Sequence, residues 1–370
     1  MIMAECIVFT GGGTGGHVFP ALAVAAELRR RWPGRIVWIG SRGGIERSIL
    51  EQKNIPFYGI PTGKLRRYLS LGNLLDAFKI CAGFIAAVFI LMRERPRLVF
   101  SKGGYVSVPP AAAAFLLGIP VFTHESDLNP GLATRINSRF AERILTSFPE
   151  TLGYFRGRAR AKVVHTGNPI RPEILGGEPA RGKRRLGCPQ AAPLVLVLGG
   201  SLGSAFLNGL IQEVIGELTA ACFLVHQMGP QNYSARRRDN YYPAPFFSEE
   251  LPDILAASDL VICRAGANTL WELAAVGKPA LLVPLSQSAS RGDQIENAAY
   301  FAQRGAARVL PEREATGARL LEIVANLLNN KSELRRMGER ARGLALPEAA
   351  ARIAEILCQR SGRAVGGIAI

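Results

Sequence analysis

The sequence lacks the common motifs that bind metal ions, and it lacks the glycine-rich loop that binds the phosphates of ATP in many proteins. None of its six aspartates belongs to a DxD pair, no GxxxxGK(S/T) loop occurs, and no cysteine forms a CxxC or CxxH pair. We therefore expect no metal site and no cofactor. If a nucleotide diphosphate is released by this protein, helix N-termini and basic side chains must balance its charge.

Two further features bear on the cellular compartment. The six cysteines are scattered and lie mostly inside apolar runs, which predicts buried, reduced thiols. They are Cys6, Cys81, Cys188, Cys222, Cys263 and Cys358. The N-terminus lacks a basic segment followed by a long apolar one, because the short run Cys6–Phe9 meets glycines at once. These features predict a cytoplasmic protein.

Acidic residues are few relative to basic ones, and the imbalance is uneven along the chain. The sequence holds 45 Lys+Arg against 29 Asp+Glu, a formal net charge of +16. Residues 1–165 hold 22 basic and 10 acidic residues, hence +12, and the remainder hold 23 and 19, hence +4. This excess predicts a polyanionic partner. Because no nucleic-acid-binding motif occurs, we favour an anionic membrane surface over nucleic acid.

The longest apolar stretch, residues 73–92, is too short to span a membrane. Asp76 and Lys79 interrupt its first half, so only Ile80–Met92 is uninterrupted, against the roughly 20 residues that a spanning helix needs. The preceding stretch Lys64–Leu69 interleaves basic with aromatic and aliphatic residues, as is typical of a surface that rests on anionic lipid. The alternative is an ordinary buried helix beside a solvated loop.

Each half of the chain begins with the same order of segments: an apolar strand, a glycine-rich loop, a helical pattern and a second strand. This βαβ rhythm is typical of parallel sheets, so we expect an α/β protein with two Rossmann-like, doubly wound domains. In order, the segments of the first half are Cys6–Thr10, Gly11–His17, Pro20–Arg31 and Ile36–Ile39. Those of the second half are Leu194–Leu198, Gly199–Ser204, a helical pattern through Leu218, and Phe223–Val225.

The boundary between the domains is expected near Gly167-Asn168-Pro169, where a strand-like run ends and a polar, turn-rich stretch follows. This gives domains 1–166 and 167–345. Ligands of open parallel sheets bind beyond the carboxyl ends of the strands. Both glycine loops lie at such ends, as do the segments Lys102–Tyr105 and His124–Asp127, so we expect them to line a cleft between the domains.

The first glycine loop matches GxGxxG through Gly11, Gly13 and Gly16. A dinucleotide site also needs an acidic residue after the second strand to hold the ribose, but that strand is followed by Ser41 and Arg42. NAD is therefore disfavoured. NADP stays open, since Arg42 offers a partner for a 2′-phosphate.

His17 and Glu272 each allow two interpretations. His17 follows the first loop at the start of a helix, where the macrodipole disfavours the imidazolium, so it is either a general base or a capping or packing histidine. Glu272 lies in a helix that follows the strand Leu260–Cys263 and ends at Gly277. Thr269 and Glu272 form a T-x-x-E pattern, so Glu272 is either a ligand contact or part of a capping box.

Seven ordered segments together resemble the MurG family of UDP-N-acetylglucosamine transferases, and they cover nearly the whole chain. They are GGGTGGHVFPALAVA, SKGGYVSVP, HESDLNPG, GNPIR, GGSLGS, CRAGANTLWELAAVGKPALLVPL and SRGDQIENA. The resemblance implies a GT-B fold, with two Rossmann-like domains facing across a cleft and a last helix, about 346–362, that packs back on the first domain.

The resemblance also implies the reaction and the partners. GlcNAc would pass with inversion from UDP-GlcNAc to the 4-hydroxyl of MurNAc in undecaprenyl-pyrophosphoryl-MurNAc-pentapeptide (lipid I), giving lipid II for peptidoglycan. The enzyme would be peripheral, on the cytoplasmic face of the plasma membrane, with cell-wall synthesis proteins as further partners. A non-hydrolysing UDP-GlcNAc epimerase of the same fold and a non-catalytic nucleotide-binding scaffold are the alternatives, and the scaffold leaves His17 and Gln294 unexplained.

Carried over by motif, the resemblance makes His17 the base for the acceptor hydroxyl and assigns most other site residues to UDP-GlcNAc. In the donor set, Thr14, Gly15 and Gly16 would face donor and acceptor, Arg171 and Ser201 would contact the phosphates, and Phe247 and Ser248 would flank the uracil. Glu272 would take the ribose hydroxyls and Gln294 the GlcNAc hydroxyls, and the set also includes Asp127, Ala267, Asn268, Thr269, Leu270 and Trp271. The acceptor set is Gly103, Gly104, Tyr105, His124 and Glu125.

The chain departs from the family pattern in two places. Some members read HEQN where this chain reads HESD, so the carboxylate of Asp127, which only accepts hydrogen bonds when ionised, replaces an amide that can also donate. The region Gln231–Pro245, which includes Arg236-Arg237-Arg238, has no counterpart that we can align.

Overall fold

The computed structural model describes residues 5–63, 71–235, 238–287 and 291–361, which form two compact units. The described residues of Met1–Pro169 and Leu346–Ile370 make up the first unit, and Ile170–Ala345 make up the second. The basic stretch Lys64–Leu69, the pair Arg236 and Arg237, and the apolar tail Ala364–Ile370 lie outside the described residues.

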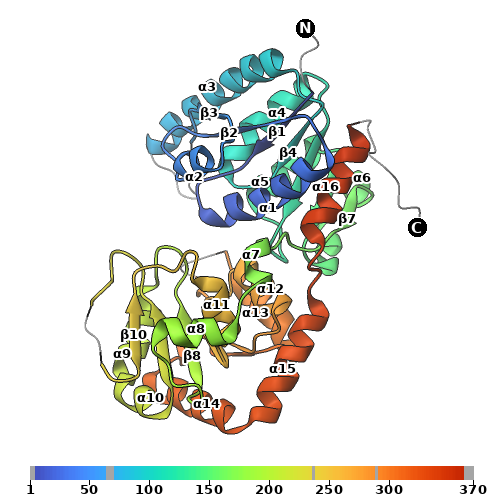
Figure 1. The fold of residues 1–370 in the computed structure, drawn as a ribbon. Coiled ribbons are helices and arrows are strands. Elements are labelled where there is room, and N and C mark those ends of the chain that lie inside the picture. The colour runs from blue at the N-terminus through green and yellow to red at the C-terminus, as the bar shows by residue number, and fades with distance from the viewer. Residues whose placement is uncertain (1–4, 64–70, 236–237, 288–290, 362–370) are drawn as a thin grey trace. The chain divides into compact units, whose positions relative to one another are not determined.

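The first unit is built on a seven-stranded parallel sheet with strand order β3-β2-β1-β4-β5-β6-β7 (Figure 1). The strands are β1 (Cys6–Thr10), β2 (Arg35–Ser41), β3 (Phe57–Ile60), β4 (Leu98–Ser101), β5 (Val121–Glu125), β6 (Arg143–Thr146) and β7 (Val163–His165). The helices are α1 (Gly15–Arg31), α2 (Glu46–Gln52), α3 (Leu71–Glu94), η1 (Tyr105–Ser107), α4 (Val108–Leu116), α5 (Leu132–Phe140), η2 (Pro149–Tyr154), α6 (Gly157–Arg160) and α16 (Ala349–Arg360).

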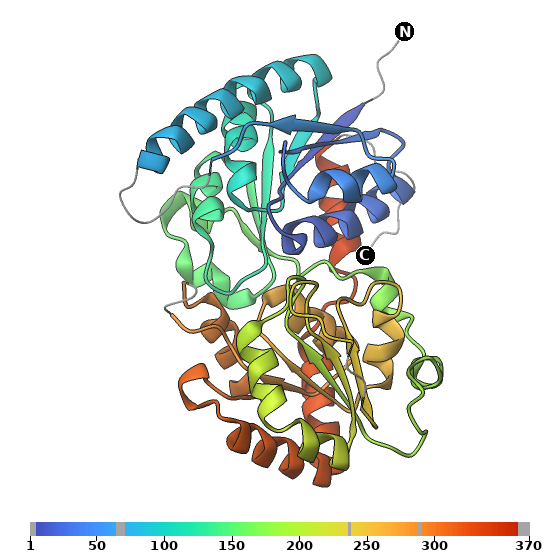
Figure 2. The ribbon, with the colours of Figure 1, turned by 90° about the vertical axis from the view of Figure 1, so that its left-hand side faces the viewer.

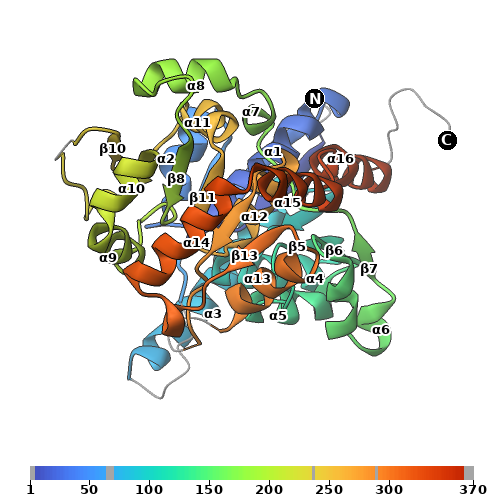
Figure 3. The same cartoon turned by 90° about the horizontal axis from the view of Figure 1, so that it is seen from below.

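The second unit repeats this order in a six-stranded parallel sheet, β10-β9-β8-β11-β12-β13. Its strands are β8 (Leu194–Leu198), β9 (Phe223–Gln227), β10 (Tyr241–Ala244), β11 (Leu260–Cys263), β12 (Ala280–Leu282) and β13 (Ala307–Val309). Its helices are α7 (Pro172–Leu175), α8 (Pro179–Leu186), α9 (Ala205–Glu213), α10 (Ile215–Ala221), α11 (Leu251–Ala257), α12 (Ala267–Ala275), α13 (Asp293–Gln303), η3 (Glu312–Glu314), α14 (Gly317–Asn329) and α15 (Lys331–Leu344). Figure 3 shows α8 beside α11 and α14 beside α15.

Both sheets have helices on their faces, which explains why the central strands are continuously apolar. All five residues of β1 and of β8 are buried, as expected for parallel strands covered on both sides. The predicted α/β class with two doubly wound sheets is confirmed.

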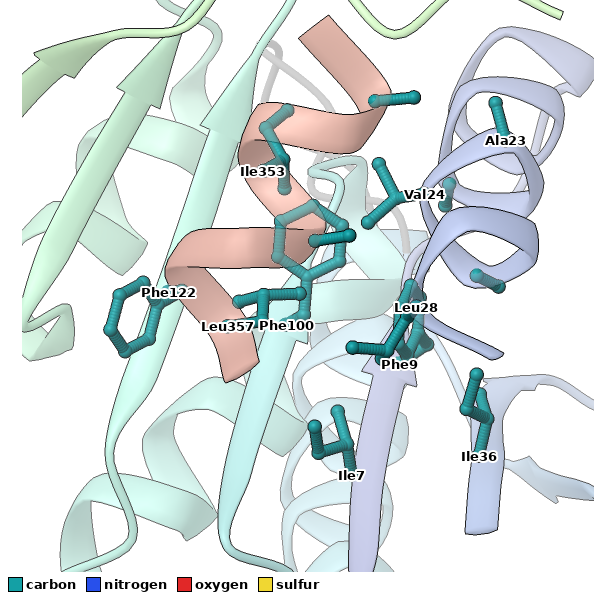
Figure 4. Packing of buried hydrophobic residues seen from close by; sticks show 14 of the residues in the cluster. Ile7, Phe9, Ala23, Val24, Leu28, Ile36, Phe100, Phe122, Ile353 and Leu357 are labelled. Carbon is teal, nitrogen blue, oxygen red and sulfur yellow. The ribbon is translucent and has the colours of Figure 1, made fainter. Parts of the chain in front are cut away.

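The last helix, α16, completes the core of the first unit. It packs against α1, and its residues Ile353 and Leu357 are fully buried in the cluster that contains Leu28 and Phe100 (Figure 4). Residues from the two ends of the chain therefore share one hydrophobic core. Since fully burying such a side chain stabilises a fold by about 1.5 to 3 kcal/mol, this helix contributes substantially to the unit.

Two helices differ from the sequence-based prediction. The first begins at Gly15, five residues before the expected Pro20, so that His17 lies in its first turn. The long helical pattern through Leu218 is divided at Val214, whose backbone has φ −127°, into α9 and α10. Next to this break, the carboxylate of Glu213 accepts a hydrogen bond of 2.9 Å from the backbone of Gly317.

The helix α3 lies along the outside of the first unit, as Figure 2 also shows. Ala87 and Leu91 are buried in the core, but Phe78, Ile85 and Phe89 are 55 to 67% exposed. The prediction that every cysteine is buried is wrong for Cys81, which is exposed on this helix. Within the described part of the chain, no helix is both long and apolar enough to cross a bilayer.

Candidate active site

Each sheet has one place where the strand order reverses, between β1 and β4 in the first unit and between β8 and β11 in the second. Loops that leave neighbouring strands at such a point diverge and open a crevice, which is where doubly wound sheets bind ligands. In the first unit these are the loops 11–14 and 102–104. In the second unit they are the loops 199–204 and 264–266.

The first glycine loop is held by two side chains. The indole Nε1 of Trp38 donates to the carbonyl oxygen of Gly11 at 3.0 Å. The buried carboxylate of Glu46 accepts from the backbone N–H of Gly13 at 3.2 Å and of Ser41 at 2.7 Å. A Cβ at Gly12 would lie 2.3 Å from the Glu46 carboxylate, so glycine is required there. No pattern in the sequence points to Glu46 beyond an acid close to several glycines.

This arrangement argues against a dinucleotide in the first loop. A phosphate-binding loop keeps its backbone N–H groups for the ligand, whereas the N–H of Gly13 is bonded to a carboxylate. A phosphate placed there would also meet the negative charge of Glu46. The NADP interpretation is therefore disfavoured along with the NAD interpretation.

His17 is half-buried in the first turn of α1, and its tautomer is defined by a main-chain contact. Its Nδ1 lies 3.2 Å from the carbonyl oxygen of Lys102. A carbonyl only accepts hydrogen bonds, so Nδ1 carries the proton and Nε2 is the basic nitrogen. Gly104 has φ +76°, and a Cβ there would lie 2.9 Å from His17 Cδ2, so glycine lets the second loop approach the ring.

The structure brings the other predicted residues of this loop pair to the same edge of the sheet. Gly15 and Gly16 are the first residues of α1, and Thr14 before them is exposed. Tyr105 is half-buried, and a Cβ at Gly13 would lie 2.8 Å from its ring, so the ring lies against the first loop. A basic imidazole nitrogen, a tyrosine and two glycine-rich segments thus lie together at the carboxyl end of the first sheet.

The loop after β5 is stabilised by its own side chains. His124 is fully buried, and its Nε2 lies 3.0 Å from the carbonyl oxygen of Gly167, while burial holds its pKa well below the usual range. Glu125 is 6% exposed and accepts from the backbone N–H groups of Asp127 at 3.0 Å and Gly131 at 2.9 Å. Glu125 thus shapes the loop that presents Asp127, while His124 bonds to the segment after β7, and the acceptor contact predicted for both residues stays a prediction.

Lys102 is a buried cation that the sequence analysis missed. It directly follows β4, is 2% exposed, and places its Nζ 2.5 Å from the Oγ of Ser126. Burial lowers the pKa of its ammonium group to about 8, against the opposing effect of the carboxylates of Glu125 and Asp127. The signal in the sequence was a lysine between an apolar strand and two glycines.

In the second unit, the glycine loop is joined to a distant segment by Gln227 at the end of β9. Its Nε2 donates to the carbonyl oxygen of Gly200 at 2.9 Å, and its Oε1 accepts from the backbone N–H of Phe247 at 2.9 Å. Gly203 has φ +79°, and a Cβ there would lie 2.0 Å from the carbonyl oxygen of Met228. The loop is therefore closely packed, with Ser201 exposed on it.

The segment expected to flank a uracil has its aromatic side chains arranged differently from the prediction. Phe247 is only 3% exposed, so its ring is not available to a ligand. Ser248 is exposed, and the neighbouring Phe246 is 42% exposed. Phe246 is thus the accessible ring that the sequence analysis missed, and Phe247 can offer only main-chain atoms.

The capping-box interpretation of Glu272 is wrong, because α12 begins three residues earlier than that pattern required. Gly266 is the N-cap, and Thr269 lies inside the helix and makes no side-chain cap. Ala267, Leu270 and Trp271 are buried, so these predicted site residues have no side chain open to a ligand. The residues Asn268, Thr269 and Glu272 are half-buried.

Glu272 instead pairs with Arg171, which precedes α7. The Arg171 Nε lies 2.7 Å from Glu272 Oε1, and Nη2 lies 2.9 Å from Oε2. Burial acts to lower the pKa of Arg171, but its bond to Glu272 outweighs this effect and the pKa is raised. Two residues that the resemblance assigns to UDP thus hold each other in place.

Two more contacts lie at the carboxyl end of the second sheet. Gln294 is the second residue of α13, and its Oε1 accepts from the backbone N–H of Leu285 at 3.2 Å. Arg264, buried directly after β11, donates to Ser204 Oγ at 3.1 Å and pairs with Glu312 at 2.8 Å. Arg264 thereby fixes the end of the second glycine loop. The described residues contain no group of three His, Cys, Asp or Glu side chains suited to a metal ion.

Comparisons with known proteins identify the same family in both halves of the chain. The model of the glycosyltransferase family 28 N-terminal domain matches residues 7–146, and that of the C-terminal domain of the same family matches residues 194–353. A protein of Treponema denticola named UDP-N-acetylglucosamine--N-acetylmuramyl-(pentapeptide) pyrophosphoryl-undecaprenol N-acetylglucosamine transferase is 45% identical, over 95% of this chain and 97% of its own. The protein of the same name from Treponema pallidum is 48% identical over 88% of each chain.

The same relationship appears among solved structures. The crystal structure of Acinetobacter baumannii MurG matches with a TM-score of 0.74 and 28% identity, covering 96% of this chain and 99% of the other. The predicted GT-B fold is thereby confirmed. The chain belongs to glycosyltransferase family 28 and, within it, to the MurG family of N-acetylglucosamine transferases.

Proposed function

We propose that this protein transfers GlcNAc from UDP-GlcNAc to the 4-hydroxyl of MurNAc in lipid I, with inversion, and so forms lipid II. The observation that carries this proposal is the 45% identity to a transferase of that name over 95% of the chain. The two family models together cover both glycine loops and the proposed site residues other than Arg171. A single displacement inverts the anomeric carbon.

His17 is the proposed general base. With Nδ1 bonded to a main-chain carbonyl, Nε2 takes the proton of the acceptor hydroxyl while the new bond to C1 of GlcNAc forms and the bond from C1 to UDP breaks. Its place in the first turn of α1 supports this role, since the helix N-terminus disfavours an imidazolium before the reaction. Gly103, Gly104 and Tyr105, beside it, are the proposed contacts of the acceptor diphosphate.

The donor groups are proposed for the second unit. Arg171 and Ser201 meet the diphosphate, Glu272 accepts from the ribose hydroxyls, and Gln294 contacts the GlcNAc hydroxyls. The N-terminus of α12, which has nine residues and a glycine N-cap, adds backbone N–H groups near Asn268 and Thr269. These groups balance the charge of the leaving UDP without a cation.

An anionic membrane surface is the proposed location of the enzyme. Along α3, Phe78, Ile85, Phe89 and Met92 are each at least 55% exposed and recur at spacings of 7, 4 and 3 residues, which places them on one helix face. Residues 1–165 also carry a charge of +12. An apolar face on a basic domain is suited to the interface of a bilayer that contains anionic lipid.

Transfer can be measured directly with labelled UDP-GlcNAc and a lipid I analogue. We expect a lipid-linked disaccharide and UDP, with a rate that a chelator such as EDTA does not change. An epimerase would convert UDP-GlcNAc to its 2-epimer without any acceptor. That product, in the absence of disaccharide, would overturn the proposal.

A further inference from the structure

Lys102 occupies an unusual position, since a lysine is rarely enclosed unless its charge has a partner. Its side chain is 2% exposed, and its Nζ donates to Ser126 Oγ at 2.5 Å. Ser126 Oγ in turn donates to Asn168 Oδ1 at 2.8 Å, which also accepts from Ser147 Oγ at 3.1 Å. The ammonium group is therefore the start of a hydrogen-bonded chain below the loop that carries Asp127.

The ammonium group of Lys102 has two carboxylates and a histidine among its neighbours. The carboxylates of Glu125 and Asp127 favour its charged form, whereas the pKa of His124 is lowered first by burial and then by the charge of Lys102. Glu125 is already committed to the backbone of Asp127 and Gly131. Asp127 is thus the carboxylate near Lys102 whose side chain is half-buried and belongs to the site.

The main chain of Lys102 contacts His17, the proposed base. The carbonyl oxygen of Lys102 accepts from His17 Nδ1 at 3.2 Å, and its N–H donates to the carbonyl oxygen of Thr10 at 2.9 Å. One residue therefore contacts the base through its backbone and the loop of Asp127 through its side chain. A change in the position of that loop can therefore reach His17 through the two hydrogen bonds of this one residue.

We propose that Lys102 is a positioning residue for the transfer reaction, whose ammonium group compensates the carboxylate of Asp127 and holds the Ser126–Asp127 segment in register with His17. The inference rests on the proposed function and on the family resemblance, which assigns Asp127 to the UDP-GlcNAc site. A carboxylate is acceptable at this position, where some family members have an amide, because the buried cation balances it. The pair acts as a unit, so neither residue can be changed alone without loss.

A double-mutant cycle tests this coupling. Wild type, Lys102→Met, Asp127→Asn and the double variant are compared for kcat and KM with UDP-GlcNAc and a lipid I analogue. We expect Lys102→Met to lower kcat/KM by about ten- to a hundredfold, mostly in kcat, since it leaves Asp127 uncompensated. Adding Asp127→Asn should restore at least about fivefold of that loss, the size of a coupling between interacting residues.

Lys278 supplies a matched control from the second unit. It is a half-buried lysine whose pKa burial also lowers to about 8, and it donates to the carbonyl oxygens of Ala256 and Ser258. Lys278→Met should lower the melting temperature without any coupling to Asp127→Asn. Effects of Lys102→Met and Asp127→Asn that simply multiply, as for the control, would overturn the proposal.

A second measurement tests the proposal even if Lys102→Met does not fold. In Asp127→Asn the ammonium loses a neighbouring anion, while Glu125 and His124 remain around it, so its pKa falls further below about 8. The alkaline limb of the kcat profile should therefore move to lower pH. An unmoved limb overturns the proposal. If wild type forms no disaccharide, the proposed function itself is rejected. This outcome differs from an unmoved limb, so failure of the proposed function can be told apart from failure of the inference about Lys102.

Discussion

Arg171 and Glu272 form a bidentate ion pair, with nitrogen to oxygen distances of 2.7 and 2.9 Å, although 101 residues separate them. The two side chains are 24% and 15% exposed, so the pair is partly shielded from water. Two parallel hydrogen bonds fix the carboxylate in a plane. Glu272 is thereby oriented before any nucleotide binds, and Arg171 keeps its position at the start of α7.

Glu272→Gln should weaken binding of UDP-GlcNAc. It removes a charge-assisted bond to the ribose and one to Arg171, so we expect a loss of about 1 to 3 kcal/mol in binding free energy. Calorimetric titration of UDP-GlcNAc measures this loss. Glu173→Gln, at an exposed acid two residues after Arg171, is the control and should bind normally. Equal affinities of wild type and Glu272→Gln would reject the donor role.

His17→Ala should lower turnover by about 10² to 10⁴, the range for one positioned base. Affinity for UDP should stay within a few-fold, because the proposed diphosphate contacts lie in other loops. The melting temperature should change little, since His17 is half-buried and bonded once to a main-chain carbonyl. Near-normal turnover per folded molecule, combined with a lower melting temperature, would instead identify His17 as a packing residue.

Ile85→Glu and Phe89→Glu should reduce binding to vesicles that contain anionic lipid. Both side chains are more than half exposed on α3, so a carboxylate there removes apolar contact with the bilayer and adds repulsion from it. Vesicle co-sedimentation at fixed ionic strength measures the change. Tyr233→Glu, at an exposed aromatic residue of the second unit, should bind as wild type does. Equal binding by all four proteins would remove α3 from the membrane surface.

Acid should destabilise the second unit through His226. Its Nε2 lies 2.9 Å from Asn208 Oδ1 and its Nδ1 lies 3.1 Å from the Tyr241 hydroxyl, and burial lowers its pKa to about 4. The folded state therefore favours the neutral ring, so its stabilising effect is complete above the unfolded pKa of about 6.5 and is lost as the pH falls towards 4.

Over that interval we expect His226 to account for about 3 kcal/mol of lost unfolding free energy. Denaturant titrations at several pH values measure the slope, and His226→Gln should flatten it between pH 6.5 and 4. The substitution keeps a polar side chain that can bond to both neighbours. If the variant and wild type lose stability in parallel, His226 is not the group that titrates.

The repeated strand, loop and helix pattern was sufficient to predict both sheets from the sequence. Continuous apolar runs identify buried parallel strands, and glycines mark the sharp turns that follow them, so Cys6–Thr10 and Leu194–Leu198 were located with the observed bounds. These are local signals. They do not depend on which distant residues come together.

The distant pairings could not be predicted in the same way. The partners of Glu46 and Lys102, and the bond between Arg171 and Glu272, depend on which loops the strand order brings together. The T-x-x-E pattern favoured a cap at Thr269, but tertiary packing started α12 at Ala267. Phe246 and Phe247 are adjacent and chemically alike, and only the fold decides that Phe247 is the buried one.

The last helix has a consequence for how the protein is made. Ile353 and Leu357 fill the core of the first unit, yet they are synthesised after the entire second unit. On the ribosome, the first unit must therefore wait with an apolar gap between Leu28 and Phe100, while Ile170–Ala345 can already fold. The N-terminal half of the nascent chain thus completes its folding last, and during that interval its exposed core is a target for chaperones and for premature membrane contact.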